Sequence, residues 1–299
     1  MNSWVLGAYQ RLPGGARSVV ASLRGLHLRS WRYGAETEAL VEAAVERESW
    51  SADTWLRWQE TRLARVLERA ATRVPYYRDQ WTARRRKGDR ASWELLENWP
   101  VLEKEPLRSN SRAFVAEDCN TQNMFHEHTS GTSGTPLDLW WSRQTVRAWY
   151  ALFEARWRRW YGVSRRDRWA ILGGQLVTAV GQRHPPFWVW NAALNQLYLS
   201  SYHLAPKLLP HFLRALERYR VRYLFGYPSA LHALAHGAGD LDPSKVQLAV
   251  AITNAEPVLD HQRAAIIGAF GCPVRETYGM AEIVAAAGEC EAGRLHLWP

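Results

Sequence analysis

From residue 125 onward, short apolar runs alternate with longer stretches of helical periodicity, and this alternation limits the fold more than any other feature. The stretches expected to form strands lie at 137–141, 169–172, 223–225, 248–253 and 274–278. The helical stretches lie at 145–161, 208–219, 229–236 and 260–270. Strands that alternate with helices predict an α/β fold in which sheets are flanked by helices. In such folds, ligands bind at the loops that follow the carboxyl ends of the strands.

The first part of the chain has a different sequence pattern. From residue 36 to about residue 73, leucines and valines recur at helical spacing with charges between them. Pro75 ends this stretch, because proline disfavours helix at the residue before it. We therefore expect residues 1–124 to form a mainly helical region and residues 125–299 to form an α/β core.

Composition excludes several classes of protein. Hydrophobic residues make up 47% of the 299 residues and charged residues 22%, which is close to the average of soluble globular proteins. No apolar run reaches the 18 or so residues that a membrane-spanning helix needs. The three cysteines, Cys119, Cys272 and Cys290, form no CxxC pair, which indicates reduced thiols. We expect a cytoplasmic location.

The N-terminal segment is basic. Five arginines and no acidic residue precede Glu36, with leucines, valines and tryptophans between the arginines. Such a segment could lie on an anionic membrane surface as a peripheral contact. Alternatively, it is a helix that packs its apolar side on the body of the protein. We favour packing, because Gly14 and Gly15 interrupt any clean apolar stripe.

One loop is rich in hydroxyl groups and glycine. It consists of Thr129, Ser130, Gly131, Thr132, Ser133, Gly134, Thr135 and Pro136. Exposed backbone N–H groups and hydroxyls can together bind phosphate oxygens. The loop lacks the GK[ST] of a Walker A motif and the GxGxxG of a dinucleotide fold. Taken alone, a cluster of this kind is more often a flexible loop.

Two further segments follow expected strands. ETYGMAE at 276–282 combines a tyrosine that can stack on a purine with a carboxylate that can hold Mg²⁺. NAEP at 254–257 could offer polar groups to an adenine edge. Loop or strand-end residues, namely Ser201, Tyr202, His203, Tyr227 and Pro228, could line an acyl pocket, although aromatic residues at such positions more often serve packing.

In their order along the chain, TSGTSGTP, NAEP and ETYGMAE resemble the adenylate-forming superfamily of acyl– and aryl–CoA ligases. More narrowly, the chain resembles the phenylacetate–CoA ligase family and its capsular polysaccharide biosynthesis relatives. Four other stretches support the resemblance: RAATRVPYYR at 69–78, WPVLEKEPL at 99–107, GYPSAL at 226–231 and CEAGRLHL at 290–297. Residues 1–124 and 125–299 would then be two parts of one large adenylation domain.

The resemblance implies a function and a site. A carboxylic acid would be activated with ATP and Mg²⁺ to an acyl-adenylate, and coenzyme A would then capture the acyl group. The resemblance assigns catalytic roles to Thr129, Ser130, Thr132 and Glu282. Glu282 would also coordinate Mg²⁺. The nucleotide would be bound by Ser130, Gly131, Thr132, Ser133, Gly134, Thr135, Ala255, Glu256, Tyr278, Gly279 and Met280, with Tyr278 stacked on the adenine.

Two departures from the family matter. Thr135 stands where many members of the superfamily have lysine. The sequence also stops at Pro299, ahead of the segments that carry the hinge and the mobile C-terminal lid domain in the family. We therefore expect an incomplete ligase without that domain, and a remnant that only binds a nucleotide or a partner is the alternative.

The remaining partners are open. A homodimer is compatible with the sequence. A nucleic-acid-binding or membrane-surface protein would explain the net charge of +9 but would leave the three ordered motifs unexplained. We expect no nucleic acid partner.

Overall fold

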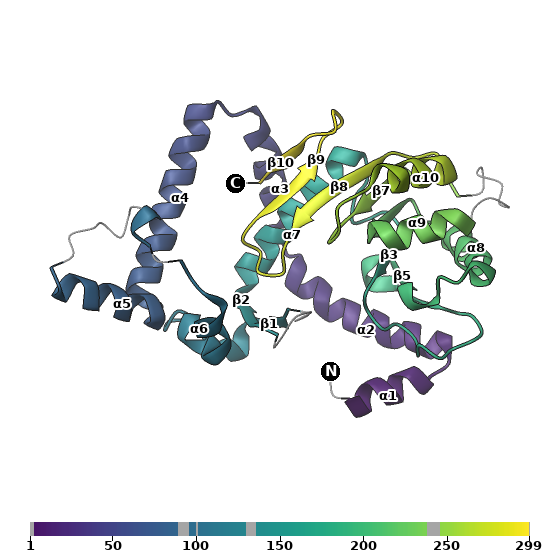
Figure 1. The fold of residues 1–299 in the computed structure, drawn as a ribbon, viewed down its shortest axis with the longest axis horizontal. Coiled ribbons are helices and arrows are strands. Elements are labelled where there is room, and N and C mark those ends of the chain that lie inside the picture. The colour runs from purple at the N-terminus through teal and green to yellow at the C-terminus, as the bar shows by residue number, and fades with distance from the viewer. Residues whose placement is uncertain (1–2, 89–95, 100, 130–135, 238–245, 299) are drawn as a thin grey trace. The chain divides into compact units, whose positions relative to one another are not determined.

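The computed structural model describes residues 3–88, 96–99, 101–129, 136–237 and 246–298 (Figure 1). The chain divides into two compact units. One unit combines residues 1–41 with residues 150–298, and the other contains residues 42–149. Two helices, α3 (Thr37–Glu46) and α7 (Arg143–Trp157), pass from one unit to the other.

The first unit is built on a sheet of eight strands in the order β10-β9-β8-β7-β6-β3-β5-β4. The middle five strands, from β8 to β5, are mutually parallel, while β4, β9 and β10 pair antiparallel to their neighbours. The strands are β3 (Trp169–Gly173), β4 (Trp188–Asn191), β5 (Gln196–Ser200), β6 (Tyr223–Gly226), β7 (Val250–Thr253), β8 (Val274–Gly279), β9 (Ala286–Glu289) and β10 (Leu295–Leu297). The predicted α/β class is confirmed.

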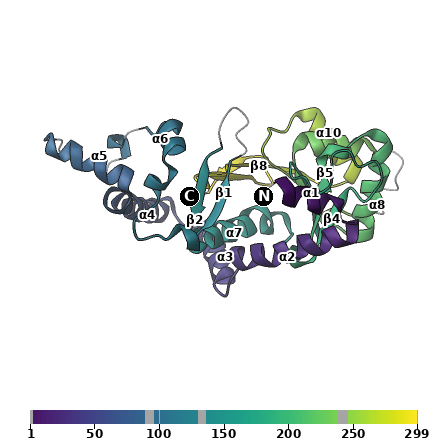
Figure 2. The ribbon, with the colours of Figure 1, turned by 90° about the horizontal axis from the view of Figure 1, so that it is seen from below.

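Helices cover this sheet on both faces. In α8 (Leu209–Tyr219) the buried residues recur at helical spacing. They join the hydrophobic core together with residues of α9 (Pro228–His236) and α10 (Asp260–Phe270). On the other face, α2 (Gly14–Arg32) packs against β4, as Figure 2 shows, and α1 (Ser3–Arg11) precedes it.

The second unit is mostly helical. Its helices include α4 (Ala52–Arg73), α5 (Pro75–Arg86) and α6 (Lys104–Ser109), and a hairpin pairs β1 (Phe125–His128) with β2 (Asp138–Trp141). Arg69 at the end of α4 forms two hydrogen bonds with Asp118, at 2.9 and 2.7 Å. Trp81 of α5 is almost fully buried and lies edge to face against Trp99. These contacts hold the segments before and after α6 against the two long helices.

Gly226, the last residue of β6, sits where the sheet leaves no room for a side chain. A Cβ at this position would lie 2.6 Å from the carbonyl oxygen of Leu172 on the neighbouring strand. Because a backbone atom cannot yield as a side chain can, we expect Gly226→Ala to lower the free energy of unfolding by about 1–3 kcal/mol. Urea denaturation followed by circular dichroism measures this loss.

The matched control is Gly268→Ala in α10. A Cβ at Gly268 would meet nothing within 4 Å. Alanine favours helix over glycine, so this variant should be as stable as the wild type or more stable, by up to about 1 kcal/mol. Equal stability of the two alanine variants would contradict the steric argument.

Candidate functional site

Two of the predicted ligand segments, NAEP at 254–257 and ETYGMAE at 276–282, come together at one edge of the sheet because the parallel strands end in register. Ser200 of β5 pairs with Gly173 of β3. Gly226 of β6 pairs with Thr253 of β7, and Thr253 pairs with Glu276 of β8. The segments that follow these strands therefore lie side by side at the carboxyl edge, which is where α/β sheets bind their ligands.

The loop after β7 carries two features of a binding site. Asn254 is partly buried, and its side-chain oxygen has no hydrogen-bond partner among the described residues. Buried polar atoms are nearly always hydrogen-bonded, so this oxygen is available to a ligand. Ala255 adopts the left-handed conformation with φ of 66°, which is unfavourable for a residue with a Cβ. Strain of this kind is often found at ligand sites.

Glu256 has a structural partner. Its carboxylate accepts hydrogen bonds from the backbone N–H of Ser229 at 3.1 Å and from the Ser229 hydroxyl at 3.0 Å. Ser229 lies in the first turn of α9, where unpaired N–H groups and the helix dipole favour a negative charge. The carboxylate thus joins the β7 loop to α9, and any contact between Glu256 and a nucleotide is left to its backbone.

The end of β8 presents the second predicted segment to solvent. The side chain of Tyr278 is half exposed, as an aromatic ring that stacks on a purine must be. A Cβ at Gly279 would lie 3.3 Å from the ring of Trp157, so close packing of this tryptophan explains the glycine. Met280 and Glu282 lie in the turn between β8 and β9, and the side chain of Met280 is exposed.

A buried ion network that the sequence motifs did not indicate holds β8 in place. Glu289 on β9 is buried and receives two hydrogen bonds from Arg263 of α10, at 3.1 and 3.0 Å. The same carboxylate accepts the backbone N–H of Glu276 at 2.6 Å. Thr277 donates its hydroxyl to the carbonyl of Thr253 at 2.5 Å. The backbone before Tyr278 is therefore fixed on both sides. The partners are separated by 13 to 26 residues, so local sequence patterns could not reveal them.

The other predicted pocket residues gather at the end of β3. Ser201 donates its hydroxyl to the carbonyl of Gly173 at 2.9 Å, and Tyr202 donates its hydroxyl to the carbonyl of Gly174 at 3.1 Å. His203 instead points into the core. Its ring stacks on Phe187, it is hydrogen-bonded to Ser200 at 2.8 Å, and burial lowers its pKa. His203 is thus a core histidine rather than a lining residue.

The hydroxyl-rich loop belongs to the second unit and connects β1 to β2. Thr129 closes the base of the hairpin, since its N–H donates to the carbonyl of Leu137 at 3.1 Å and its hydroxyl accepts the N–H of Leu137 at 3.0 Å. The predicted phosphate-binding residues Ser130, Gly131, Thr132, Ser133, Gly134 and Thr135 lie outside the described residues.

Glu282 fits a role as a magnesium ligand. Its half-buried carboxylate forms no hydrogen bond or ion pair with any residue that the structure describes, so its oxygens are free to bind a hard cation. Within the described ranges, no group of three or more histidine, cysteine, aspartate or glutamate side chains could hold a metal ion. A cation at Glu282 would therefore need oxygens from the substrate, as Mg²⁺ usually does in nucleotide sites.

No helix in the described part of the chain is long and apolar enough to cross a bilayer.

Comparison with known proteins places the chain among relatives of similar fold. Protein CapK of Staphylococcus aureus is 26% identical over 200 residues, which are 66% of this chain and 44% of CapK. A crystal structure of 2-hydroxyisobutyryl-CoA ligase in an open conformation, in complex with 2-HIB-AMP and CoA, superposes with a TM-score of 0.54 at 19% identity, covering 76% of this chain and 55% of the ligase. The same ligase in the thioesterification state superposes with the same score at 19% identity and covers 82% of this chain and 54% of the ligase.

The chain thus spans about half the length of these relatives. At such identities, the likeness to the solved structures shows a shared fold, which is the sheet and helices of the acyl–CoA ligase N-terminal domain. The family model described as AMP-binding enzyme matches residues 54–296, which is most of the chain. The chain belongs to the AMP-binding enzyme family.

Proposed function

We propose that this chain binds ATP and takes part in the activation of a carboxylic acid to an acyl-adenylate. The observation that carries the proposal is the alignment of three strand ends, which brings the Asn254 and Tyr278 segments to one edge of the sheet. Membership of the AMP-binding enzyme family supports the same chemistry.

In this proposal, the side chains position the reactants and none acts as a nucleophile. Tyr278 stacks on the adenine, and the unpaired oxygen of Asn254 accepts a hydrogen bond from a polar group of the nucleotide. The substrate carboxylate attacks the α-phosphorus of ATP and pyrophosphate leaves. Mg²⁺, when bound at Glu282, neutralises charge on the phosphate oxygens. By the family resemblance, the phosphates would receive hydrogen bonds from the Thr129 hydroxyl and from N–H groups and hydroxyls of residues 130–135.

The finer proposals concern the acyl group. We propose that coenzyme A is the acceptor, as in the phenylacetate–CoA ligase family that the sequence resembles. The likeness to CapK and to the capsular branch of that family supports a role in surface polysaccharide biosynthesis. Ser201, Tyr202 and Tyr227 follow strands at the same edge of the sheet and are the candidates to line the acyl pocket.

Isothermal titration calorimetry with ATP and Mg²⁺ tests the nucleotide site. We expect the wild type to bind and Tyr278→Ala to bind about tenfold more weakly, because stacking of a base on an aromatic ring contributes about 1–3 kcal/mol. Tyr202→Ala is the matched control, since it removes an equally exposed tyrosine that we assign to the acyl side.

Two results would count against the proposal. If the folded wild-type chain binds no ATP, these residues do not form a working nucleotide site. If the chain binds ATP but exchanges no pyrophosphate with a panel of carboxylic acids, it is a nucleotide-binding module without adenylation activity of its own.

A further inference from the structure

A basic pocket lies at the amino ends of the parallel strands, away from the edge that carries the nucleotide motifs. Trp169, which begins β3, and Asn195, which precedes β5, both line it. Its volume is about 580 Å³. Among the residues that the structure describes, five arginines and no acidic side chain line this pocket: Arg29, Arg32, Arg158, Arg165 and Arg166. We call this the arginine pocket.

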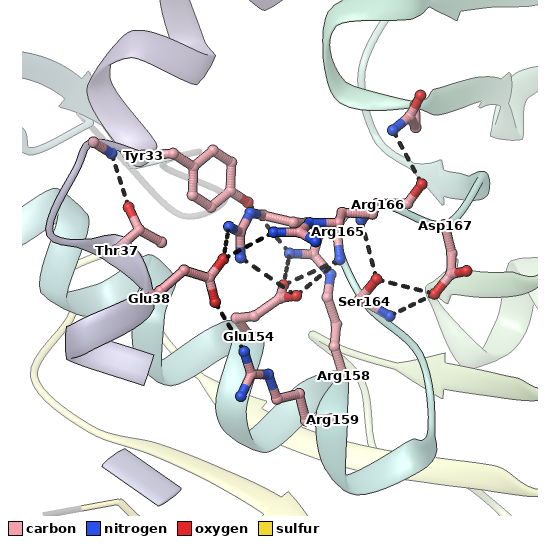
Figure 3. Close-up of polar contacts among 12 residues, drawn as sticks. Tyr33, Thr37, Glu38, Glu154, Arg158, Arg159, Ser164, Arg165, Arg166 and Asp167 are labelled. Carbon is pink, nitrogen blue, oxygen red and sulfur yellow. Dashed lines mark hydrogen bonds and ion pairs between the residues drawn. The ribbon is translucent and has the colours of Figure 1, made fainter. Parts of the chain in front are cut away.

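Carboxylates behind the pocket neutralise only part of this charge (Figure 3). Glu154 is buried and pairs with Arg158 at 2.9 Å. Glu38 pairs with Arg165 and, at 3.4 Å, with Arg166, and its hydrogen bond from Arg165 lowers its pKa. The arrangement therefore holds more positive than negative charge.

Two arginines of the pocket come from α2 and have no carboxylate partner. Arg29 is exposed and forms no ion pair with any described residue. Arg32 places its guanidinium over the ring of Tyr150, 4.5 Å from the ring centre, and likewise forms no ion pair in the described part of the chain. Unpaired guanidinium groups beside a hollow favour an anionic oxygen ligand, such as a phosphate.

The outer face of α2 leads into this pocket and is apolar. Val19, Leu23 and Leu26 recur every three or four residues and are 60%, 62% and 56% exposed. Leu26 also lines the arginine pocket. Arg24 and Arg29 flank the stripe, and both are exposed. We call Val19, Val20, Leu23 and Leu26 the outer stripe.

The outer stripe is separate from the face by which α2 packs on the sheet. The hydroxyl of Ser18 accepts the N–H of Trp190 at 3.1 Å, and the hydroxyl of Ser22 accepts the N–H of Ala192 at 3.0 Å. Gly25 is buried, and a Cβ there would collide with the side chain of Asn191. The expected packing of this helix on the body of the protein thus occurs on one side only. The opposite side remains solvent-exposed.

We propose that the outer stripe and the arginine pocket together dock this protein on an anionic membrane surface. The positive charge favours an anionic membrane over other binding partners, because the segment before Glu36 contains arginines and no acidic residue. Apolar side chains of a surface helix enter the boundary between headgroups and acyl chains, while basic residues beside them bind lipid phosphates. The arginine pocket receives one such headgroup phosphate.

This arrangement leaves the nucleotide edge free. The five residues of β3 separate the arginine pocket at Trp169 from the carboxyl edge at Gly173, a distance of about 13 Å along the strand. A protein docked through α2 can therefore bind a nucleotide at the same time. Membrane docking is independent of the proposed adenylation activity.

Vesicle cosedimentation tests the proposal. The wild type should bind vesicles of phosphatidylcholine and phosphatidylglycerol in equal parts, more weakly at high salt, and should not bind vesicles of phosphatidylcholine alone. Each basic residue near an anionic surface changes partitioning about fivefold. Reversing two charges, in Arg29→Glu with Arg166→Glu, should therefore weaken binding at least twentyfold. Leu23→Gln with Leu26→Gln should weaken it at least tenfold.

The control variants make similar changes on helices of the first unit that lie outside the outer stripe and the arginine pocket. Arg214→Glu with Arg218→Glu reverses two exposed arginines of α8, and Ile267→Gln replaces an exposed apolar residue of α10. Both controls should bind vesicles like the wild type. Circular dichroism establishes that every variant is folded.

Several outcomes would overturn the proposal. One is equal loss of binding in the controls, and another is wild-type protein that stays in the supernatant with anionic vesicles. A third is a dimer in sedimentation velocity that Leu23→Gln with Leu26→Gln converts to a monomer, without vesicle binding by either protein. That result would assign the outer stripe to a second copy of the chain.

Discussion

Replacing Glu282 by alanine is expected to slow ATP–pyrophosphate exchange about a hundredfold or more. In the proposed function, this carboxylate holds Mg²⁺ against phosphate oxygens whose charge grows in the transition state. Loss of one group that stabilises such charge typically costs a factor of about 10²–10³ in rate. The carboxylate has no partner among the described residues, so its removal should leave the stability of the fold unchanged.

Two comparison variants test whether the negative charge of Glu282 is responsible for this effect. Glu282→Gln keeps the size of the side chain but binds Mg²⁺ poorly, and it should be nearly as slow as Glu282→Ala. Glu291→Ala removes an exposed carboxylate from the turn between β9 and β10 and should exchange at the wild-type rate. A Glu282→Ala variant with the wild-type rate at every Mg²⁺ concentration would remove this residue from the site.

The sequence predicts the central elements of the sheet because they are buried on both faces. β3, β6 and β7 lie where apolar runs of three to six residues predict strands, and β8 lies where a strand is expected at 274–278. The helices α8, α9 and α10 lie where helical spacing predicts helices. Residues buried on both faces of a parallel strand are continuously apolar, so the pattern is distinct. The expected helix after residue 36 is likewise present, although it breaks between α3 and α4, and a new helix, α5, begins at Pro75.

The strands β4 and β5 are among the elements that were not predicted. β4 and β5 each contain polar residues that face the interior, with Asn191 and Gln196 both buried, so they carry no clear alternation. In α2, Gly25 is a poor helix former, but its lack of a Cβ lets Asn191 approach. Gly14, Gly15 and Gly25 obscure the helical pattern of α2, and of these Gly25 lies where packing against Asn191 leaves no room for a Cβ. Tertiary contacts override local propensity here, and the sequence alone does not reveal such contacts.

The sequence likewise indicates some residues of the candidate site and not the residues that support them. The motifs identify Ala255, Tyr278 and Glu282, and the strand register brings their segments to one edge. The assignment of these residues to a nucleotide stays a prediction, as does the division of the chain at residue 124. The supports behind the site, in particular Glu289 with Arg263, depend on pairs that are distant in sequence. Glu256 shows that a residue within a motif can also serve the fold.

Replacing Arg158 by methionine should produce the largest loss of stability among the variants considered. The guanidinium donates to the Tyr223 hydroxyl at 2.8 Å and to Glu154 at 2.9 Å, and nearly all of both charged side chains is buried. Burial disfavours the charged arginine, but its polar partners outweigh that effect and raise its pKa. Without Arg158, the buried Glu154 carboxylate retains the Arg165 backbone N–H at 3.0 Å and a distant Arg165 guanidinium at 3.6 Å.

Removing one partner of a buried ion pair typically costs about 3–5 kcal/mol, and urea denaturation should show a loss of this size for Arg158→Met. The double variant Arg158→Met with Glu154→Gln tests the cause. Glutamine still accepts the Arg165 N–H but carries no charge, so the double variant should recover at least half of the loss. Arg166→Met, at a side chain 79% exposed, should stay within about 0.5 kcal/mol of the wild type. If the double variant were less stable than Arg158→Met alone, the loss would come from packing around the arginine rather than from the unpaired carboxylate.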